Sequence, residues 1–527
     1  MLLADTLRKA YHLFPRKQAI VCGGRRWTYE EFYRRISRFT RFLQEAGIRE
    51  GDRVAILHPN CHSFLEVYYA VALRGAAAVP LNFRLSAGEI ALILGDAGAR
   101  LLVVDPRFRE TVATVRASLP CLERIVWTGA EEGELPAGGR EVRYEGLVAG
   151  PALPVEEAAI TEDAIAQLYY TSGTTGRPKG VILTHRNVTV HALGTIAELG
   201  LTDRDVWLHA APLFHLADAW ATWAITWVGG THVVVGEFDP PAVLAAVEAE
   251  QVTLTNLIPT MLNMLINHPG VKEYDYQRLR VLLSGGAPIA PEVVRRIVET
   301  FGCDYIQTYG MTETSPYLTL SRLKGHLAER PPEEQLRFKS KTGREFIAVE
   351  LKVVAADGRE VAPDEREVGE IIVRGDTVTP GYWQLPEETA RAIKGGWLST
   401  GDMAVIDDEG YVTIVDRRKD MIVTGGENVY STEVENTLYQ HSAVMECAVV
   451  GVPDEKWGEA VKAIVVLKPG RQATEEELIA FCKERIARYK SPKSIDFLSA
   501  LPKTGSGKIE KKKLRDRYWP EGEKKVG

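Results

Sequence analysis

Short apolar runs alternate with amphipathic runs along much of the chain. The intervening residues 64–75 and 86–98 have helical spacing, and Ser86 with Glu89 fits a capping box at a helix N-terminus. Such alternation predicts parallel strands connected by helices, in doubly wound α/β layers. The apolar runs with the length and composition of buried strands are residues 53–59 (RVAILHP), 76–82 (AAAVPLN) and 100–105 (RLLVVD).

The same alternation returns in the middle of the chain. In open α/β sheets ligands bind outside the carboxyl ends of the strands. The glycine-containing turns at the ends of the strands that begin at residues 280 and 304 therefore point to one crevice. The predicted strands here are residues 231–236, 252–259, 280–286 and 304–310, and the predicted helices are 241–251 and 291–302.

The pattern changes near residue 365 to short strands and turns, which predict a small antiparallel β unit over residues 365–415. After residues 416–420 (DRRKD) a compact helix–strand–strand–helix–strand pattern follows. We therefore expect an α/β protein with a large N-terminal domain, residues 1–418, of doubly wound layers plus the small β unit. A small α+β C-terminal domain, residues 419–527, is expected to follow it.

Composition narrows the classes of function. The chain of 527 residues carries a net charge of −7, which gives no reason to expect a nucleic-acid partner. Its six cysteines are scattered singly, so neither a zinc site nor a disulfide framework is indicated, and reduced thiols favour a cytoplasmic protein. The uncharged run between Asp218 and Glu237 is divided by Gly229-Gly230, which predicts a buried helix, turn and strand rather than a membrane span.

Residues 171–180 (TSGTTGRPKG) combine glycines, hydroxyl side chains and two cations, which suits a loop that wraps an anion. The segment is not a Walker A motif, because Pro178 stands where a glycine must precede Lys179. It also lacks the GxGxxG order of a dinucleotide fold.

This segment and the motifs YGMTE (309–313), STGD (399–402), DRRKDMIVTGGENVY (416–430) and PKTGSGKI (502–509) occur in an order that resembles the adenylate-forming superfamily. That superfamily includes acyl- and aryl-CoA synthetases, firefly luciferase and peptide-synthetase adenylation domains. The resemblance extends from about Thr6 to Arg515. It implies that a carboxylate attacks the α-phosphorus of ATP and expels pyrophosphate, and that coenzyme A then takes the acyl group.

The resemblance also implies roles for single residues. Tyr309 would lie against the adenine, Asp402 and Arg417 would contact the ribose, and Glu313 with Thr171 would hold Mg²⁺. Lys508 would meet the carboxylate and the α-phosphate. The residues implied to bind ATP and AMP are Thr171, Ser172, Gly173, Thr174, Thr175, Gly176, Lys179, Gly286, Ala287, Pro288, Thr308, Tyr309, Gly310, Met311, Thr312, Asp402, Arg417 and Lys508.

In the resemblance Lys419 is the hinge about which a mobile C-terminal domain rotates between adenylation and thioester formation. Gly425 and Gly426 would line a pantetheine tunnel, and Lys490 would meet the CoA nucleotide. One departure is visible: Ser431 stands where many relatives carry proline, and we expect it to affect little beyond loop stiffness.

Residues 211–220 (APLFHLADAW) resemble the wall of an acyl pocket, with His215 as its gate and Trp220 as apolar bulk. The motif spacing is closest to medium- and long-chain fatty acyl-CoA synthetases. An aryl-acid ligase, a luciferase-like oxidative enzyme and a non-catalytic acyl-binding protein are the alternatives. Only residues 509–527 follow Lys508, so no carrier domain is expected. The expected partners are a carboxylic acid, ATP and CoA, while a homodimer and peripheral membrane contact are left open.

Overall fold

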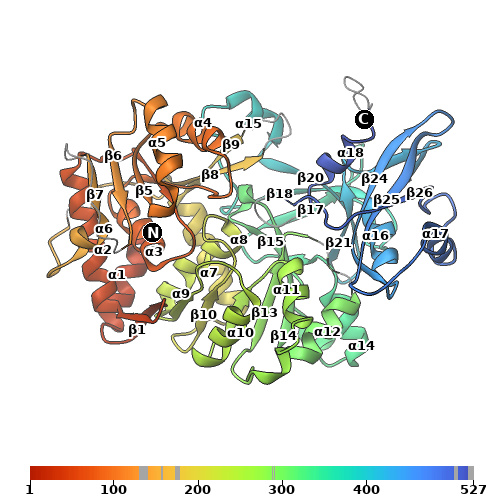
Figure 1. The fold of residues 1–527 in the computed structure, drawn as a ribbon, viewed down its shortest axis with the longest axis horizontal. Coiled ribbons are helices and arrows are strands. Elements are labelled where there is room, and N and C mark those ends of the chain that lie inside the picture. Colours follow the sequence, from red (N-terminus) through yellow and green to blue (C-terminus); the bar gives the residue numbers. More distant parts are fainter. Residues whose placement is uncertain are drawn as a thin grey trace.

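The computed structural model of the chain is drawn in Figure 1, with the N-terminal helices at one end and the C-terminal sheet at the other. Within the described residues the strands form three sheets, and the predicted α/β class is confirmed. The residues that the structure describes are 1–129, 140–155, 158–172, 178–287, 289, 291–503 and 509–519.

The first sheet has the strand order β7-β6-β5-β3-β4-β8-β9. Its strands run parallel except for β9, which pairs antiparallel with β8. The strands are β3 (Arg53–Leu57), β4 (Ala77–Pro80), β5 (Ala99–Val104), β6 (Arg124–Trp127), β7 (Glu141–Arg143), β8 (Ile165–Ser172) and β9 (Pro178–Thr184). The helices of this part are α1 (Leu3–Leu13), α2 (Tyr29–Glu45), α3 (His62–Leu73), α4 (Ala87–Ala97), α5 (Arg109–Ser118) and α6 (Tyr144–Val148).

The second sheet is the largest. Its order is β17-β18-β20-β21-β16-β15-β14-β13-β12-β10-β11-β1-β2, and β19 pairs with β20. The parallel strands are β1 (Gln18–Cys22), β11 (Thr231–Val234), β10 (Val206–His209), β12 (Leu254–Asn256), β13 (Val281–Gly285) and β14 (Asp304–Gly310). The antiparallel strands are β2 (Arg25–Thr28), β15 (Tyr317–Leu320), β16 (Gly343–Glu345), β17 (Glu350–Val354), β18 (Gly369–Arg374), β19 (Ile393–Lys394), β20 (Trp397–Ile406) and β21 (Tyr411–Arg417).

The predicted antiparallel β unit over residues 365–415 is present but not separate. Strands β15 and β16 connect β14 to β21, so the parallel and antiparallel strands share one hydrogen-bonded sheet. The helices that accompany this sheet are α7 (His185–Leu199), α8 (Leu216–Ala219), α9 (Ala221–Val228), α10 (Pro240–Ala249), α11 (Pro259–Ile266), α12 (Pro291–Phe301), α13 (Gly325–Ala328), α14 (Pro332–Lys339) and α15 (Pro386–Ala392).

The C-terminal sheet has the order β23-β22-β25-β24, and β26 pairs parallel with β25. The predicted helix–strand–strand–helix–strand series is confirmed, and a β22–β23 hairpin precedes it. The elements are β22 (Ile422–Thr424), β23 (Glu427–Val429), α16 (Ser431–Tyr439), β24 (Val444–Asp454), β25 (Gly458–Leu467), α17 (Glu475–Lys483), β26 (Ser494–Phe497) and α18 (Lys511–Arg515).

The uncharged run after Asp218 forms a buried helix, turn and strand, as predicted. Helix α9 ends at Gly229, whose φ of 74° is the left-handed conformation that glycine adopts readily, and β11 follows. The place of a Cβ at Gly229 is taken by the ring of Phe14, which follows α1. Across the described ranges, no helix is both long and apolar enough to cross a membrane.

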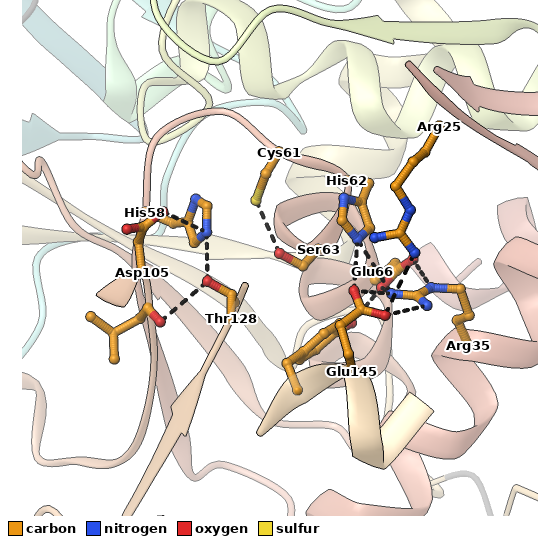
Figure 2. Close-up of polar contacts among 12 residues, drawn as sticks. Arg25, Arg35, His58, Cys61, His62, Ser63, Glu66, Asp105, Thr128 and Glu145 are labelled. Atoms are coloured by element: carbon orange, nitrogen blue, oxygen red, sulfur yellow. Dashed lines mark hydrogen bonds and ion pairs between the residues drawn. The ribbon is translucent and has the colours of Figure 1, made fainter. Parts of the chain in front are cut away.

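A buried cluster of charged side chains ties α2, α3 and α6 together (Figure 2). The Arg35 guanidinium lies 2.6 Å from Glu66 Oε1 and 3.0 Å from Glu145 Oε2, with side chains of Arg35 and Glu66 only 6% and 1% exposed. The Tyr144 hydroxyl donates to Glu66 at 2.6 Å, and His62 Nε2 lies 3.3 Å from Glu145. Every charge in this cluster therefore has an opposite partner.

The cluster also sets the protonation of His62. Burial lowers the pKa of His62, but hydrogen bonds with Cys22 and Glu145 and the charge of Glu66 outweigh burial and raise the pKa to about 9. His62 is thus cationic at neutral pH. Its contribution to stability is fully present below the unfolded pKa of about 6.5 and is lost as pH rises through about 9.

We expect Glu66→Gln to lower the free energy of unfolding by about 3 kcal/mol, because one partner of a buried ion pair is removed. Chemical denaturation followed by tryptophan fluorescence measures the loss. Glu45→Gln is the matched control, since Glu45 forms an exposed pair with Arg41 at 2.9 Å and should change stability by less than about 0.5 kcal/mol. Equal effects of the two variants would contradict the importance of the cluster.

Candidate active site

The C-terminal ends of β14 and β21 and the middle of β20 bring together three residues predicted to bind the nucleoside. The Tyr309 hydroxyl donates a hydrogen bond to Asp402 Oδ2 at 2.6 Å, and Arg417 Nε lies 3.1 Å from Asp402 Oδ1. Asp402 and Arg417 are direct partners across the antiparallel β20–β21 pair. The buried carboxylate is therefore fixed from two sides. Two acceptor oxygens held in this way suit the vicinal hydroxyls of a ribose.

The protonation states of this trio follow from burial and from Asp402. Burial raises the pKa of Tyr309 well above its usual value, and the Asp402 charge raises it further. Burial lowers the pKa of Arg417, but Asp402, Asp420 and Tyr309 together outweigh that effect, and the net shift is upward. Tyr309 is thus a neutral donor, and Arg417 is a cation.

The turns after β13 and β14 lie side by side, because these strands are parallel neighbours with Gly285 opposite Thr308. Gly286 has a φ of +89°, and the Ala287 carbonyl accepts a hydrogen bond from Gln307 Nε2 at 3.1 Å. At Gly310 a Cβ would collide with the Pro316 carbonyl, so this position requires glycine. The predicted residues Thr308, Gly310, Met311 and Thr312 therefore share one edge with Gly286 and Ala287, while Pro288 lies outside the described residues.

The predicted phosphate loop connects two antiparallel strands, β8 and β9, across which Thr171 pairs with Lys179. Lys179 Nζ forms an ion pair with Glu388 of α15 and lies 5.5 Å from the centre of the Tyr382 ring. The cation predicted to meet phosphate thus has a carboxylate partner in this structure. Gly173, Thr174, Thr175 and Gly176 lie outside the described residues, and Ser172 is described by its backbone alone.

Glu313 is a buried carboxylate close to these elements. Its Oε1 accepts a hydrogen bond from the Tyr382 hydroxyl at 3.0 Å, and its backbone carbonyl accepts one from the Thr379 amide at 2.7 Å. Burial raises the pKa of Glu313. A buried carboxylate that is costly to ionise gains from a bound cation, so Glu313 fits Mg²⁺, which commonly takes one or two carboxylates plus substrate phosphates. No larger group of metal-ligating side chains occurs in the described part of the chain.

The residues predicted to line the acyl pocket lie at α8. His215 stands at the N-cap position of this helix and is partly exposed. Trp220, just after the helix, is only 1% exposed, and its Nε1 donates to the Ala217 carbonyl at 3.1 Å. Its ring packs against Trp207 at 4.8 Å and Tyr317 at 5.4 Å. Trp220 therefore belongs to the hydrophobic core, and its role in a pocket wall stays a prediction.

The C-terminal residues predicted to bind CoA lie on separate elements. Gly425 and Gly426, with φ of +60° and +86°, form the turn of the β22–β23 hairpin, and the Trp457 ring occupies the place of a Cβ at Gly425. Lys490 Nζ lies 2.8 Å from Glu433, which raises its pKa against the effect of burial. Burial, and then the charge of Arg417, lower the pKa of the predicted hinge residue Lys419. Lys508 lies outside the described residues.

Ser431, the departure from the common motif, does more than affect loop stiffness. Its backbone amide donates to Asp416 Oδ2 at 2.6 Å, and its hydroxyl accepts from Lys511 Nζ at 2.6 Å. Lys511 also lies 2.7 Å from Glu435. Asp416 precedes the predicted hinge and the other residues follow it, so these contacts cross the predicted domain boundary. Proline at position 431 would abolish both hydrogen bonds of Ser431.

A model of the family described as AMP-binding enzyme matches residues 7–383, and one described as AMP-binding enzyme C-terminal domain matches residues 433–508. The chain belongs to the AMP-binding enzyme family. The matches fall on either side of residue 419 without locating the hinge, which stays a prediction.

The relatives of this AMP-binding enzyme include CoA ligases of several kinds. It is 42% identical to feruloyl-CoA synthase of Amycolatopsis sp over 506 residues, 96% of each chain. It is 36% identical to long-chain-fatty-acid–CoA ligase of Thermus thermophilus, covering 98% of this chain and 95% of that protein. The structure of the anthranilate CoA ligase AuaEII with anthranoyl-AMP superposes with a TM-score of 0.88 at 28% identity, covering 98% and 97% of the chains.

This AMP-binding enzyme is therefore an acid–thiol ligase, and ATP and CoA are its co-substrates. The predicted acyl-CoA synthetase branch is confirmed. The comparisons do not support medium- or long-chain fatty acids over other acids. The relatives include aryl-acid and fatty-acid ligases at similar coverage.

Sequence reasoning missed some residues that contact the predicted site. Tyr382 contacts both Glu313 and Lys179, and Asp416 contacts Ser431 across the predicted boundary. Tyr382 follows Gly381, whose φ of +149° is a conformation that favours glycine. The glycine before Tyr382 was the local signal that the sequence offered. No local signal identified Asp416, because its partner is fifteen residues away in the sequence.

We expect Glu313→Gln to raise the Mg²⁺ concentration for half-maximal adenylation about tenfold, because one anionic oxygen ligand is lost. The melting temperature without ligands should be unchanged or higher, since the raised pKa of Glu313 shows that its ionisation opposes folding at neutral pH. Magnesium titrations of pyrophosphate release measure the first effect. Glu360→Gln, which removes an exposed carboxylate, is the control. An unchanged Mg²⁺ dependence would place Glu313 outside the metal site.

We expect Ser431→Pro to leave the fold intact, because Ser431 is the first residue of α16, where proline is tolerated. The ratio of the present domain orientation to any rotated one should fall about tenfold, about 1.4 kcal/mol, since a hydrogen bond to a charged group is lost. Fluorescence energy transfer between labels on residues before and after Lys419 measures this ratio. Ser431→Ala keeps the amide donor and should have a smaller effect. Identical energy transfer in the unmodified enzyme and both variants would show that the Ser431 hydrogen bonds do not stabilise the present domain orientation.

Proposed function

We propose that this enzyme is an aryl-acid–CoA ligase that activates a hydroxycinnamate-type acid. The observation that carries the proposal is the 42% identity over 96% of both chains to feruloyl-CoA synthase. The structural neighbour that holds anthranoyl-AMP supports an aromatic acid independently. A fatty acid is the second candidate, supported by the 36% identity to a long-chain-fatty-acid–CoA ligase.

The packing around α8 favours a compact acid over a long chain. Four aromatic side chains here are each at most 2% exposed: Trp207, Trp220, Tyr317 and Phe346. Their rings pack against one another, and the His191 ring packs against that of Phe346. Interiors packed in this way have little room for an inserted chain, and displacing large aromatic side chains is costly. An aromatic ring that enters at the partly exposed edge near His215 needs less displacement than a long chain.

In the proposed reaction the carboxylate oxygen of the acid attacks the α-phosphorus of ATP, and the bond to pyrophosphate breaks. The thiolate sulfur of CoA then attacks the acyl carbon, and AMP leaves with the electron pair of the broken bond. Tyr309, Asp402 and Arg417 would hold the nucleoside while both steps take place. Lys508 would balance the charge that develops between the carboxylate and the α-phosphate.

Glu313 and the Thr171 hydroxyl would hold Mg²⁺, which neutralises phosphate charge when it is bound. For Lys179 to reach a phosphate it must leave Glu388, which is 23% exposed beside it. Exchange of a carboxylate for a phosphate keeps the lysine paired with an anion, so the exchange loses little. Lys490 would approach the CoA nucleotide by a similar exchange with Glu433.

We expect the purified enzyme to use ferulate and 4-coumarate with kcat/KM at least tenfold above octanoate and palmitate. Formation of AMP that depends on both ATP and CoA is measured under anaerobic conditions, which excludes an oxidative luciferase-like reaction. Benzoate tests whether the propenoate spacer matters. A preference for the fatty acids would overturn the aryl-acid proposal while leaving the acid–thiol ligase reaction in place.

A further inference from the structure

Asn256 ends β12 near the centre of the largest sheet. Trp207 of β10 pairs with Leu254, and side chains two residues apart on a strand share a face. Asn256 therefore lies on the same face of the sheet as Trp207 and His209, the face that α8 covers through the contacts of Asp218 with both residues. Its side chain is a polar amide within an otherwise largely apolar core, and the residue is 3% exposed.

Only one end of this amide is satisfied. Asn256 Nδ2 donates to the Ala217 carbonyl of α8, which also accepts from Trp220 Nε1. Asn256 Oδ1 has no hydrogen-bond partner among the described residues, although it is buried. The amide cannot reverse without placing its oxygen against the Ala217 carbonyl oxygen. A buried acceptor without a donor is unfavourable, and each such group in a native protein requires an explanation, such as a bound water or ligand.

Asn256 contacts residues next to both parts of the proposed site. Ala217 is partly exposed and lies two residues after His215. The Leu257 amide, next to Asn256, donates to the Leu283 carbonyl at 3.0 Å, so β12 ends beside the strand that leads to Gly286 and Ala287. Asn256 thus stands between the predicted acyl residues and the predicted adenine turn.

We infer that Asn256 determines specificity by accepting, at Oδ1, a hydrogen bond from a hydroxyl group on the ring of the acid. This inference rests on the proposed function. A phenol has a pKa of about 10 and is a donor at neutral pH, as the tyrosine side chain is. An alkyl chain, an unsubstituted ring or a ring ether carries no donor and leaves the oxygen unpaired. The preferred substrate class is therefore a ring-hydroxylated aryl acid.

The test compares 4-coumarate with cinnamate and 4-methoxycinnamate. The three acids differ only in the substituent at position 4 of the ring, which is a hydroxyl, a hydrogen or a methoxy group. We expect kcat/KM of the unmodified enzyme to be at least tenfold higher for 4-coumarate than for either analogue, because a site built for a hydroxyl disfavours ligands that lack it. Asn256→Leu keeps the size of the side chain and removes the acceptor. In this variant the ratio of kcat/KM for 4-coumarate to kcat/KM for either analogue should fall to within about threefold of one, mostly because kcat/KM for 4-coumarate falls.

Thr255→Val is the matched control. Thr255 precedes Asn256 on the same strand, is equally buried and faces the other side of the sheet, with its hydroxyl bonded to the Leu208 carbonyl. The 4-coumarate to cinnamate ratio should be unchanged in this variant even if its melting temperature falls. If Asn256→Leu does not fold, Asn256→Ala and the comparison of the three acids on the unmodified enzyme still decide the inference.

Equal kcat/KM for the three acids on the unmodified enzyme would overturn the role of Asn256 while leaving an aryl-acid ligase. An unchanged ratio in Asn256→Leu, with both acids weakened equally, would show that Asn256 acts only in packing. Failure to use any aryl acid would overturn both this inference and the proposed function, and the fatty acids of the first panel identify that case.

Discussion

The hydrogen bond from Tyr309 to Asp402 depends on one constraint, the continuity of the largest sheet from its parallel to its antiparallel strands. Tyr309 lies near the end of the last parallel strand, and Asp402 lies on an antiparallel strand almost a hundred residues later. Strands β15 and β16 connect the two by short ladders. Gly310 allows the Pro316 carbonyl to come close enough for β15 to turn back on β14. Without that close approach the proposed nucleoside residues would not meet.

Sequence patterns predicted the parallel layers well, because buried parallel strands are continuous apolar runs and their carboxyl ends share one edge. They did not show that β1 joins β11, nor that the antiparallel unit extends the same sheet, since both depend on pairings between distant residues. The glycine turns at Gly286 and Gly310 were found from local signals. Tyr382 and Asp416 were not, because a tertiary contact gives them their significance.

The cations expected to meet anionic ligands share a physical feature. Lys179, Arg417 and Lys490 each have a carboxylate partner, namely Glu388, Asp402 and Glu433. The partners of the two lysines are 23% and 37% exposed, whereas Asp402 is 7% exposed. Asp402 is also held by the hydrogen bond from Tyr309, so this carboxylate is fixed in place although Arg417 itself is 55% exposed. This difference fits lysines that meet ligands transiently and an aspartate that holds a nucleoside throughout.

Selection of an acid by Asn256 requires that α8 be held in place, since a hydrogen bond discriminates only when its acceptor cannot move. Asp218 of α8 supplies that rigidity. Its buried carboxylate accepts from Trp207 Nε1 at 3.0 Å and lies 2.7 Å from His209 Nδ1. His209 contacts His232, which contacts Thr226 of α9, so a fully buried polar chain joins both helices to the sheet. The energy of a buried carboxylate left without these partners is high, which keeps Asp218 and its part of α8 against the sheet. A polar network inside an aromatic core thus fixes the helix whose carbonyl orients the Asn256 amide, and the free oxygen keeps one position in which to meet a substrate hydroxyl.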